Sequence, residues 1–130
     1  MADEIFFTAA HIRYLLTLKK LHKESGIKST DIAKALGLTK ASVHNMMNTF
    51  LSMDYIKKEH GWLVFLTEHG LEKASLYEIY HSKLKEKLFS DKSTDHTADM
   101  AIYAFLAELS DQSLDALTRE VQFFENEVLS

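Results

Sequence analysis

The chain has 130 residues, 46% of them hydrophobic and 26% charged, with a formal net charge of −4 and no cysteine. This composition is that of a compact globular protein, and the missing cysteines exclude disulfides and thiolate metal sites. The longest apolar runs are too short to cross a membrane, and no charged-then-apolar leader precedes them. We therefore expect a cytoplasmic protein with no membrane partner.

The charge is unevenly distributed along the sequence. Residues 1–66 hold nine Lys/Arg against six Asp/Glu, a formal charge of +3, whereas residues 67–130 hold six against thirteen, a charge of −7. The acidic total argues against a nucleic-acid partner only if the chain is treated as uniform. We therefore expect two regions, a basic one over 1–66 and an acidic one over 67–130 with a different role.

The first predicted elements are a helix over about 8–24 and a helix-turn-helix over 30–53. Thr30 is the expected N-cap of the first helix of this pair, and Gly37 supplies the left-handed residue that ends it. Leu38 is then expected to return to the core. Thr39 is expected to cap the second helix, whose apolar residues recur at spacings of three and four: Val43, Met46, Met47, Phe50 and Leu51.

The free face of this second helix is small, polar and without acidic residues, and consists of Thr39, Lys40, Ala41, Ser42, His44, Asn45 and Asn48. Such a face suits close approach to bases and phosphates in a DNA major groove. The structural alternative is the solvated side of an ordinary amphipathic helix.

A β-hairpin is predicted directly after the recognition helix, over residues 55–66, with its turn at 59–61. A hairpin in this position is a wing. Lys57, Lys58 and His60 near its end are placed to contact the DNA backbone, and the structural alternative is a solvated hairpin tip.

Three further helices are expected, over 67–89, 95–109 and 110–128. Thr67 is expected to cap the first, whose apolar residues are Leu71, Ala74, Leu76, Tyr77, Tyr80, Leu84 and Leu88. The stretch from Met100 to Ala107 is apolar on all sides and must be buried on more than one, which predicts a homodimer contact. The fold class is thus mainly α, a winged helix-turn-helix DNA-binding domain over 1–66 followed by an α-helical dimerisation region over 67–130.

This order of elements resembles the iron- and manganese-dependent repressors of the diphtheria toxin repressor and manganese transport regulator type. The matching motifs are DIAKALGLTKASV around the turn and LTEHGLEKA after the wing, which fits the family's LTxxGxxxA. The likeness extends from Tyr80-His81 to Leu109-Ser110 and so covers nearly the whole chain of a short member. It implies a transcription regulator, expected to be a repressor, that binds double-stranded DNA as a homodimer. The family's DNA contacts carry over to Thr39, Ala41, Ser42 and Asn45, and charge adds Lys40.

The family's metal site does not carry over with the DNA contacts. The resemblance places Arg13, Leu16, Tyr103, Leu106 and Ala107 where the manganese regulators have ligands, and only His81 remains a ligand type. One His cannot hold Mn²⁺ or Fe²⁺, so we expect no metal cofactor and no switch by these ions. A divalent transition metal on other residues is the alternative, through Glu78 with His81 or through Asp95, His96 and Asp99. The simpler explanation of that last group is that acidic residues in the first turn of a helix complement its dipole.

A structural replacement for the metal is expected at the same place. Arg13 brings a fixed positive charge and Tyr103 a hydroxyl, so we predict that Arg13, His81 and Tyr103 converge. Arg13 pointing into solvent is the alternative.

Two other functional classes compete with this interpretation, and an enzyme is not one of them. The sequence has no G-x-S-x-G, no H-E-x-x-H, no Gly-rich phosphate loop and no thiol. A regulator of the multidrug-resistance (MarR) type that senses a small molecule is one competitor, although the Asp-x-Arg element of that family's wing is missing here. A protein–protein interaction module built on a winged helix is the other.

Overall fold

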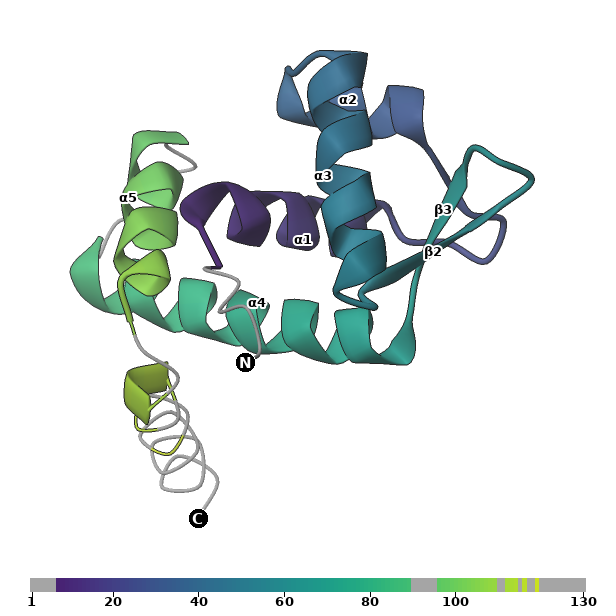
Figure 1. Ribbon diagram of the computed structural model, residues 1–130. Helices are drawn as coiled ribbons and strands as arrows, with labels where there is room; N and C mark the ends of the chain where they lie inside the picture. Colours follow the sequence, from purple (N-terminus) through teal and green to yellow (C-terminus); the bar gives the residue numbers. More distant parts are fainter. Residues whose placement is uncertain (1–6, 90–95, 110–111, 115, 117–118, 120–130) are drawn as a thin grey trace. The chain divides into compact units, whose positions relative to one another are not determined.

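The computed structural model of the chain describes residues 7–89, 96–109, 112–114, 116 and 119. Five helices and three short strands lie within these residues (Figure 1). Their order is α1 (Ala9–Leu21), β1 (Ile27–Lys28), α2 (Ser29–Leu36), α3 (Lys40–Ser52), β2 (Ile56–Glu59), β3 (Leu63–Leu66), α4 (Glu68–Leu88) and α5 (His96–Ala107). The predicted fold class, mainly α with a winged helix-turn-helix, is confirmed.

Two compact units make up the chain. Residues 13–76 form one, here called the winged-helix unit, and residues 1–12 with 77–130 form the other, here called the helical unit. The division falls inside α1 and inside α4, because both helices contribute residues to each unit. The expected domain boundary at 66/67 coincides with the end of β3, and as a domain assignment it stays a prediction.

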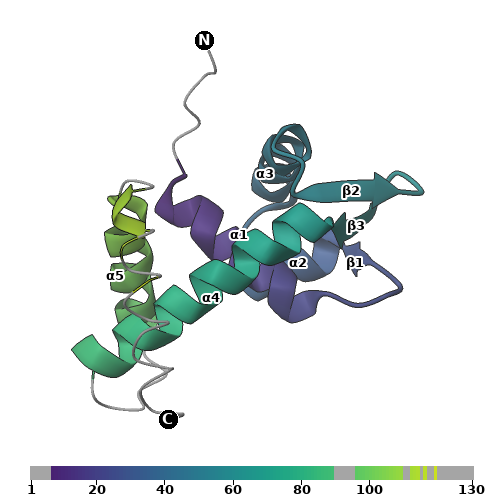
Figure 2. The same ribbon diagram turned by 90° about the horizontal axis from the view of Figure 1, so that it is seen from below.

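The sheet of the winged-helix unit is antiparallel, in the order β1-β3-β2. Ile27 pairs with Val64, and Ile56 pairs with Leu66. All four of these side chains are buried, so one face of the sheet closes the core that α1, α2 and α3 build from the other side (Figure 2). The core residues of these helices are Leu15, Leu18, Ile32, Leu36, Val43, Met47 and Phe50.

The helix-turn-helix forms largely as expected, with corrections at its edges. Gly37 adopts the left-handed conformation (φ 67°), and its N–H donates to the carbonyl groups of Ala33 and Lys34. The first helix begins at Ser29 after an extended Lys28 that makes no side-chain cap bond, so the expected cap at Thr30 was wrong. Leu38 is 38% exposed rather than in the core, because the turn carries it outward.

The start of α4 is fixed against the end of α3 by the residues of the LTEHG motif. The Thr67 N–H donates to the Tyr55 carbonyl (3.0 Å), and the Thr67 hydroxyl donates to the Asp54 carbonyl (2.6 Å). The same hydroxyl oxygen accepts the Gly70 N–H (3.0 Å), which confirms Thr67 as the N-cap. Gly70 is buried so closely against Tyr55 that a Cβ there would lie 2.8 Å from the Tyr55 carbonyl carbon.

The helical unit contains the first turn of α1, the second part of α4, and α5. At the start of α1, the Thr8 oxygen Oγ1 accepts the His11 N–H (3.2 Å), and His11 Nδ1 accepts the Thr8 N–H (2.9 Å). This reciprocal pair is a capping box with His in the position usually held by Glu or Gln. Phe7 stacks between His11 and Tyr77, at ring separations of 5.3 and 5.2 Å. Burial lowers the pKa of His11 below its usual value.

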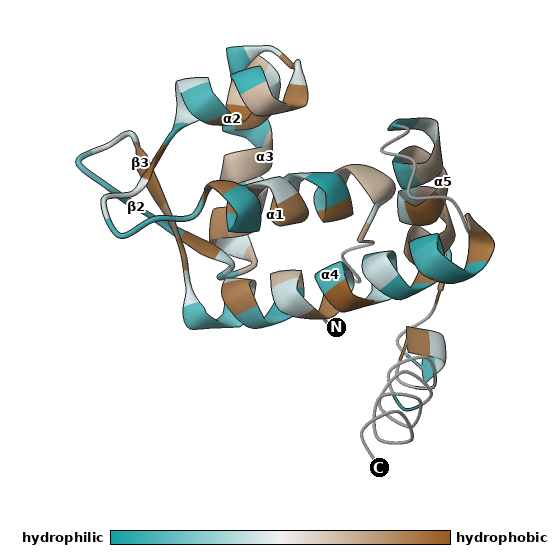
Figure 3. Ribbon diagram, turned by 180° about the vertical axis from the view of Figure 1, so that it is seen from behind, coloured by the Kyte–Doolittle hydropathy of each residue, from teal (hydrophilic) through white to brown (hydrophobic). Residues whose placement is uncertain are grey.

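Helix α5 buries one face and exposes another. Ala98, Ile102 and Leu106 are buried, while Met100 (37%) and Phe105 (47%) are among the exposed large apolar residues. Figure 3 shows the hydrophobic bands that run along this helix.

The apolar stripe predicted for α4 is only partly buried. Ala74, Tyr77 and Tyr80 are in the core, but Leu71 (38%) and Leu88 (60%) are exposed, as is Leu76. The predicted helix over 110–128 lies mostly outside the described residues. Among the helices of the described ranges, none is both long and apolar enough to cross a membrane.

Candidate nucleic-acid interface

The outward face of α3 presents the residues predicted to contact DNA. Thr39, Lys40, Ala41, Ser42 and Asn45 are all exposed. The Thr39 oxygen Oγ1 accepts the Ser42 N–H (3.1 Å), which confirms Thr39 as the N-cap. Because Thr39 also donates to the Ser42 hydroxyl (3.0 Å), the two hydroxyl groups at the start of the helix are held in one orientation.

The middle of the same face offers amide and imidazole groups. The Asn48 amide contacts His44 Nε2 at 3.3 Å, so these two side chains are already paired one turn apart. Asn45 lies beside them and is exposed, and its side chain makes no hydrogen bond to any residue that the structure describes. An exposed, unpaired amide on a recognition helix is suited to bidentate pairing with adenine.

The two wing lysines lie on opposite faces of β2. Lys57 pairs with Phe65 in the ladder, where its ammonium lies 5.6 Å from the Phe65 ring and 3.5 Å from Glu59. Lys58 pairs with Val64, whose side chain faces the core. Side chains of adjacent strand residues point to opposite faces, so the two lysines direct their charges to the two sides of the hairpin.

The turn of the wing lies one residue later than predicted and exposes a tryptophan. It consists of His60, Gly61 and Trp62, here called the wing tip, with His60 and Gly61 at positive φ (55° and 78°). Trp62 is 62% exposed, and its ring lies 6.4 Å from that of His60. The predicted turn at 59–61 places Trp62 in a strand, so its exposed position at the turn was not predicted. The signal available was a bulky aromatic residue directly after a turn glycine, beside two lysines.

Arg13 has a well-defined partner in the winged-helix unit. Its Nη2 donates to the Leu36 carbonyl at the end of α2 (2.9 Å), where a carbonyl group without a helical partner carries partial negative charge. The described contacts therefore place Arg13 at the helix-turn-helix. Of the three residues expected to converge, they bring together His81 and Tyr103, whose rings stack at 5.3 Å.

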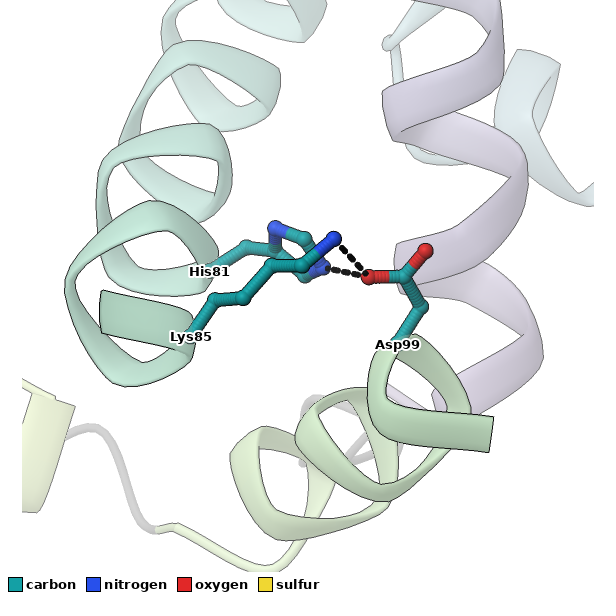
Figure 4. Close-up of polar contacts among 3 residues, drawn as sticks. All are labelled: His81, Lys85 and Asp99. Atoms are coloured by element: carbon teal, nitrogen blue, oxygen red, sulfur yellow. Dashed lines mark hydrogen bonds and ion pairs between the residues drawn. The ribbon is translucent and has the colours of Figure 1, made fainter. Parts of the chain in front are cut away.

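A polar cluster joins α4 to α5 in the helical unit (Figure 4). His81 Nε2 and Asp99 Oδ1 are 2.8 Å apart, and Lys85 Nζ donates to the same Asp99 oxygen at 3.2 Å. All three side chains are partly buried, with exposed fractions between 17% and 26%. His96 is exposed at the start of α5, and Asp95 lies outside the described residues.

This cluster does not fit a divalent metal ion. Within the described ranges, no three His, Asp or Glu side chains are grouped so that they could hold one. The carboxylate nearest to His81 already bonds the Lys85 ammonium, and a metal ion bound there would lie next to that positive charge. Glu78 lies on the same helix as His81 and is exposed.

Comparisons with known proteins agree with the geometry of the winged-helix unit. Residues 21–60, less than half of the chain, match the model of the IclR helix-turn-helix domain. A comparison with curated proteins found no match. Among solved structures, the chain is similar to the hypothetical protein SSo2273 from Sulfolobus solfataricus (TM-score 0.62, 25% identity, 88% of each chain covered).

Two further proteins of known structure share the fold at lower identity. The IdeR protein of T. acidophilum matches with a TM-score of 0.58 and 16% identity over 85% of this chain and 53% of that one. Streptococcus pneumoniae FabT, solved in complex with DNA, matches with a TM-score of 0.50 and 21% identity over 88% and 76%. The chain therefore contains a helix-turn-helix DNA-binding domain, within a winged-helix fold that it shares with these proteins.

Proposed function

We propose that the protein is a transcription regulator that binds double-stranded DNA as a homodimer and acts as a repressor by covering its operator. The observation that carries the proposal is the exposed face of α3. It offers hydroxyl, amide and ammonium groups and no carboxylate over Thr39, Lys40, Ala41, Ser42 and Asn45. The winged-helix unit supports it, since residues 13–76 hold ten Lys/Arg against six Asp/Glu.

Each group on this face has a distinct role in the proposed complex. Hydroxyl groups at the start of α3 suit phosphate oxygens, because they lie where the helix dipole already favours an anion. Ala41 can contact a thymine methyl group and Asn45 can pair with adenine. Lys57 and Lys58 neutralise phosphates and therefore contribute affinity rather than sequence preference.

The test is a binding measurement on DNA selected from a randomised duplex pool. Fluorescence anisotropy at two salt concentrations should show a steep loss of affinity at the higher one. Asn45→Ala should weaken binding to the selected sequence by about 1–3 kcal/mol and relax one base position. Gln112→Ala is the matched control, since it removes an exposed amide from the helical unit. No selected sequence, or unchanged binding by Asn45→Ala, would contradict the assignment of α3 as the reading helix.

The homodimer is proposed to form through the exposed face of α5. Met100, Ala101, Ala104 and Phe105 are exposed on this helix, so an apolar stripe remains uncovered in a single chain. Neighbouring exposed apolar side chains of this kind typically mark an interaction surface. A two-fold dimer would present two recognition helices to half-sites one helical turn, or a multiple of it, apart.

Sedimentation at micromolar concentration tests the dimer. Phe105→Glu should yield monomers and lose affinity for the two-half-site operator, because a charge would be buried at the contact. Leu71→Glu is the control, since Leu71 is a similarly exposed apolar residue of the winged-helix unit. A Phe105→Glu variant that remains dimeric would exclude this face as the interface.

Regulation is proposed to be independent of Mn²⁺ and Fe²⁺. The contact of His81, Lys85 and Asp99, with Tyr103 stacked on His81, ties α4 to α5 through the protein's own charges. Assignment to the iron- and manganese-dependent repressors is thus proposed for the architecture and not for the metal switch.

Control by a small molecule, as in MarR-type regulators, is the second candidate. One observation favours it: an open hollow of about 430 Å³ in the winged-helix unit, lined by Leu21, Lys23, Ile27, Asp31, Lys34 and Ala35. A ligand held there would contact α2 and could change how the helix-turn-helix meets DNA. Release of bound DNA by a small organic acid or amine, abolished in Ala35→Trp, would favour this candidate. If the protein binds no DNA duplex, the remaining hypothesis is a protein–protein interaction module built on a winged helix.

A further inference from the structure

Trp62 is the large apolar side chain with the highest exposed fraction among the described residues. Its exposed fraction of 62% exceeds that of Leu88 (60%) and Phe105 (47%). The indole N–H has no hydrogen-bond partner among those residues, and the ring contact recorded for Trp62 is the loose one with His60. An amphipathic ring held at the end of a hairpin can bury apolar area and donate one hydrogen bond to a partner.

We propose that Trp62 enters the DNA minor groove and makes the wing tip a reader of A·T base pairs. The inference rests on the proposed DNA-binding function and adds a specificity residue to it. The wing tip carries no carboxylate, because His60, Gly61 and Trp62 are its three residues. The residue directly before the wing tip, Glu59, is acidic, and its carboxylate contacts the Lys57 ammonium at 3.5 Å.

The arrangement of charge around the wing tip fits a minor groove. This groove is about 6 Å wide, so a whole two-stranded hairpin cannot enter it but a single side chain can. Phosphates line both of its walls. Lys57 and Lys58 point to opposite faces of β2, directly behind the wing tip, so each is directed toward a different wall. Figure 2 shows the turn between β2 and β3 at the far end of the hairpin, away from α3.

The chemistry of the indole selects the base pair. A·T pairs offer only acceptors in the minor groove, adenine N3 and thymine O2, whereas G·C pairs add the guanine amino group as a donor. The indole N–H can donate a hydrogen bond to the acceptors of an A·T pair. At a G·C pair it faces the guanine amino group, which is also a donor, so no hydrogen bond forms between the two. Its apolar body can pack on the deoxyribose rings, as apolar side chains of other minor-groove binders do.

The test compares three duplexes that share the selected half-sites and differ in the base pairs beneath the wing tip. These pairs are A·T, G·C or inosine·cytosine, which keeps the major-groove pattern of G·C and lacks its minor-groove amino group. By anisotropy, the wild type should bind the A·T and inosine duplexes about 10-fold more tightly than the G·C duplex. Trp62→Ala should lose about 10-fold on A·T and bind all three alike, and Trp62→Phe should keep affinity but lose the preference. Leu71→Ala should behave as the wild type.

Intrinsic fluorescence gives an independent reading, because Trp62 is the only tryptophan of the chain. Its emission should shift to shorter wavelength on binding the A·T duplex. Binding by anisotropy without this shift, with Trp62→Ala as selective as the wild type, would overturn the inference and leave the proposed function intact. An emission shift with anionic lipid vesicles but not with DNA would overturn it as well. Failure of the wild type to bind any duplex would overturn both.

Discussion

Replacing Gly70 by Ala should destabilise the winged-helix unit even though Ala favours helices. An added Cβ would overlap the Tyr55 carbonyl oxygen and lie 2.8 Å from its carbon, and both atoms belong to rigid backbone. Relief requires α4 to move away from Tyr55. That movement stretches the bond from the Thr67 N–H to the Tyr55 carbonyl, now 3.0 Å long.

The opposing contributions can be compared in magnitude. Overpacking typically costs about 1–3 kcal/mol. A weakened backbone hydrogen bond adds about 1 kcal/mol. The higher helix propensity of Ala relative to Gly offsets up to about 1 kcal/mol of this destabilisation. The net loss should be about 1–3 kcal/mol, which for a chain of this size lowers Tm by about 3–12 °C.

Urea and thermal unfolding followed by far-ultraviolet circular dichroism measure this loss. Glu72→Ala is the control on the same helix, since Glu72 is exposed and its substitution meets no backbone. Gly37→Ala is a second control. Gly37 has a positive φ (67°) but open space around an added Cβ, so this substitution should cost about 1–2 kcal/mol from the left-handed conformation alone. If Gly70→Ala were as stable as Glu72→Ala, close backbone approach would not be the reason for the glycine.

Three further changes test the helix caps and the polar cluster. Burial lowers the pKa of His11 in the folded protein, so as pH falls the unfolded chain protonates this histidine before the folded protein does. The contribution of His11 to stability is therefore complete above its unfolded pKa of about 6.5 and declines as pH falls below that value. The urea midpoint of the wild type should therefore fall more between pH 7.5 and 5 than that of His11→Gln, which keeps a capping-box side chain. Thr39→Ala should cost about 1 kcal/mol of stability by loss of the bond to the Ser42 N–H, and additionally weaken DNA binding in anisotropy titrations. Micromolar Mn²⁺ should leave Tm unchanged in calorimetry. A rise in Tm would reveal a native Mn²⁺ site, because an ion that binds only the folded protein must stabilise it.

The features predicted correctly from the sequence are those set by a few neighbouring residues. Gly37 and Thr39 were assigned because a left-handed C-cap and an N-cap each depend on one residue and the next helical turn. The wing followed from alternating residues on both sides of a glycine. β1 was not predicted, because two residues are too few for any periodicity and Ile27 is in a strand only through its pairing with β3. The failed cap at Thr30 has a similar cause, since the strand carries the chain into the helix at Lys28.

The partners of partly buried polar side chains were harder to predict, because they depend on residues distant in sequence. Arg13 was expected to complement His81, yet its hydrogen bond goes to Leu36, 23 positions away. Asp99 was noted only for its spacing to Asp95 and His96. Asp99 on α5 pairs with His81 on α4, 18 positions away in the sequence, and the periodicity of a single helix cannot indicate such a pair. Trp62 was missed because a one-residue shift of the turn decides whether it lies in the ladder or at the exposed end.

The cluster of His81, Lys85 and Asp99 gives a physical reason for the proposed independence of Mn²⁺ and Fe²⁺. A divalent cation would hold two helices together by attracting donors from both. Here one carboxylate on α5 receives an ammonium and an imidazole from α4, at 3.2 and 2.8 Å, and Tyr103 of α5 stacks on the imidazole. The positive charge that joins the helices is thus part of the chain and present at any metal concentration. In the proposed regulator, a cation that is covalently part of the chain cannot report the supply of a metal ion. The link between α4 and α5 would then be a constant feature of the fold rather than a metal-dependent switch.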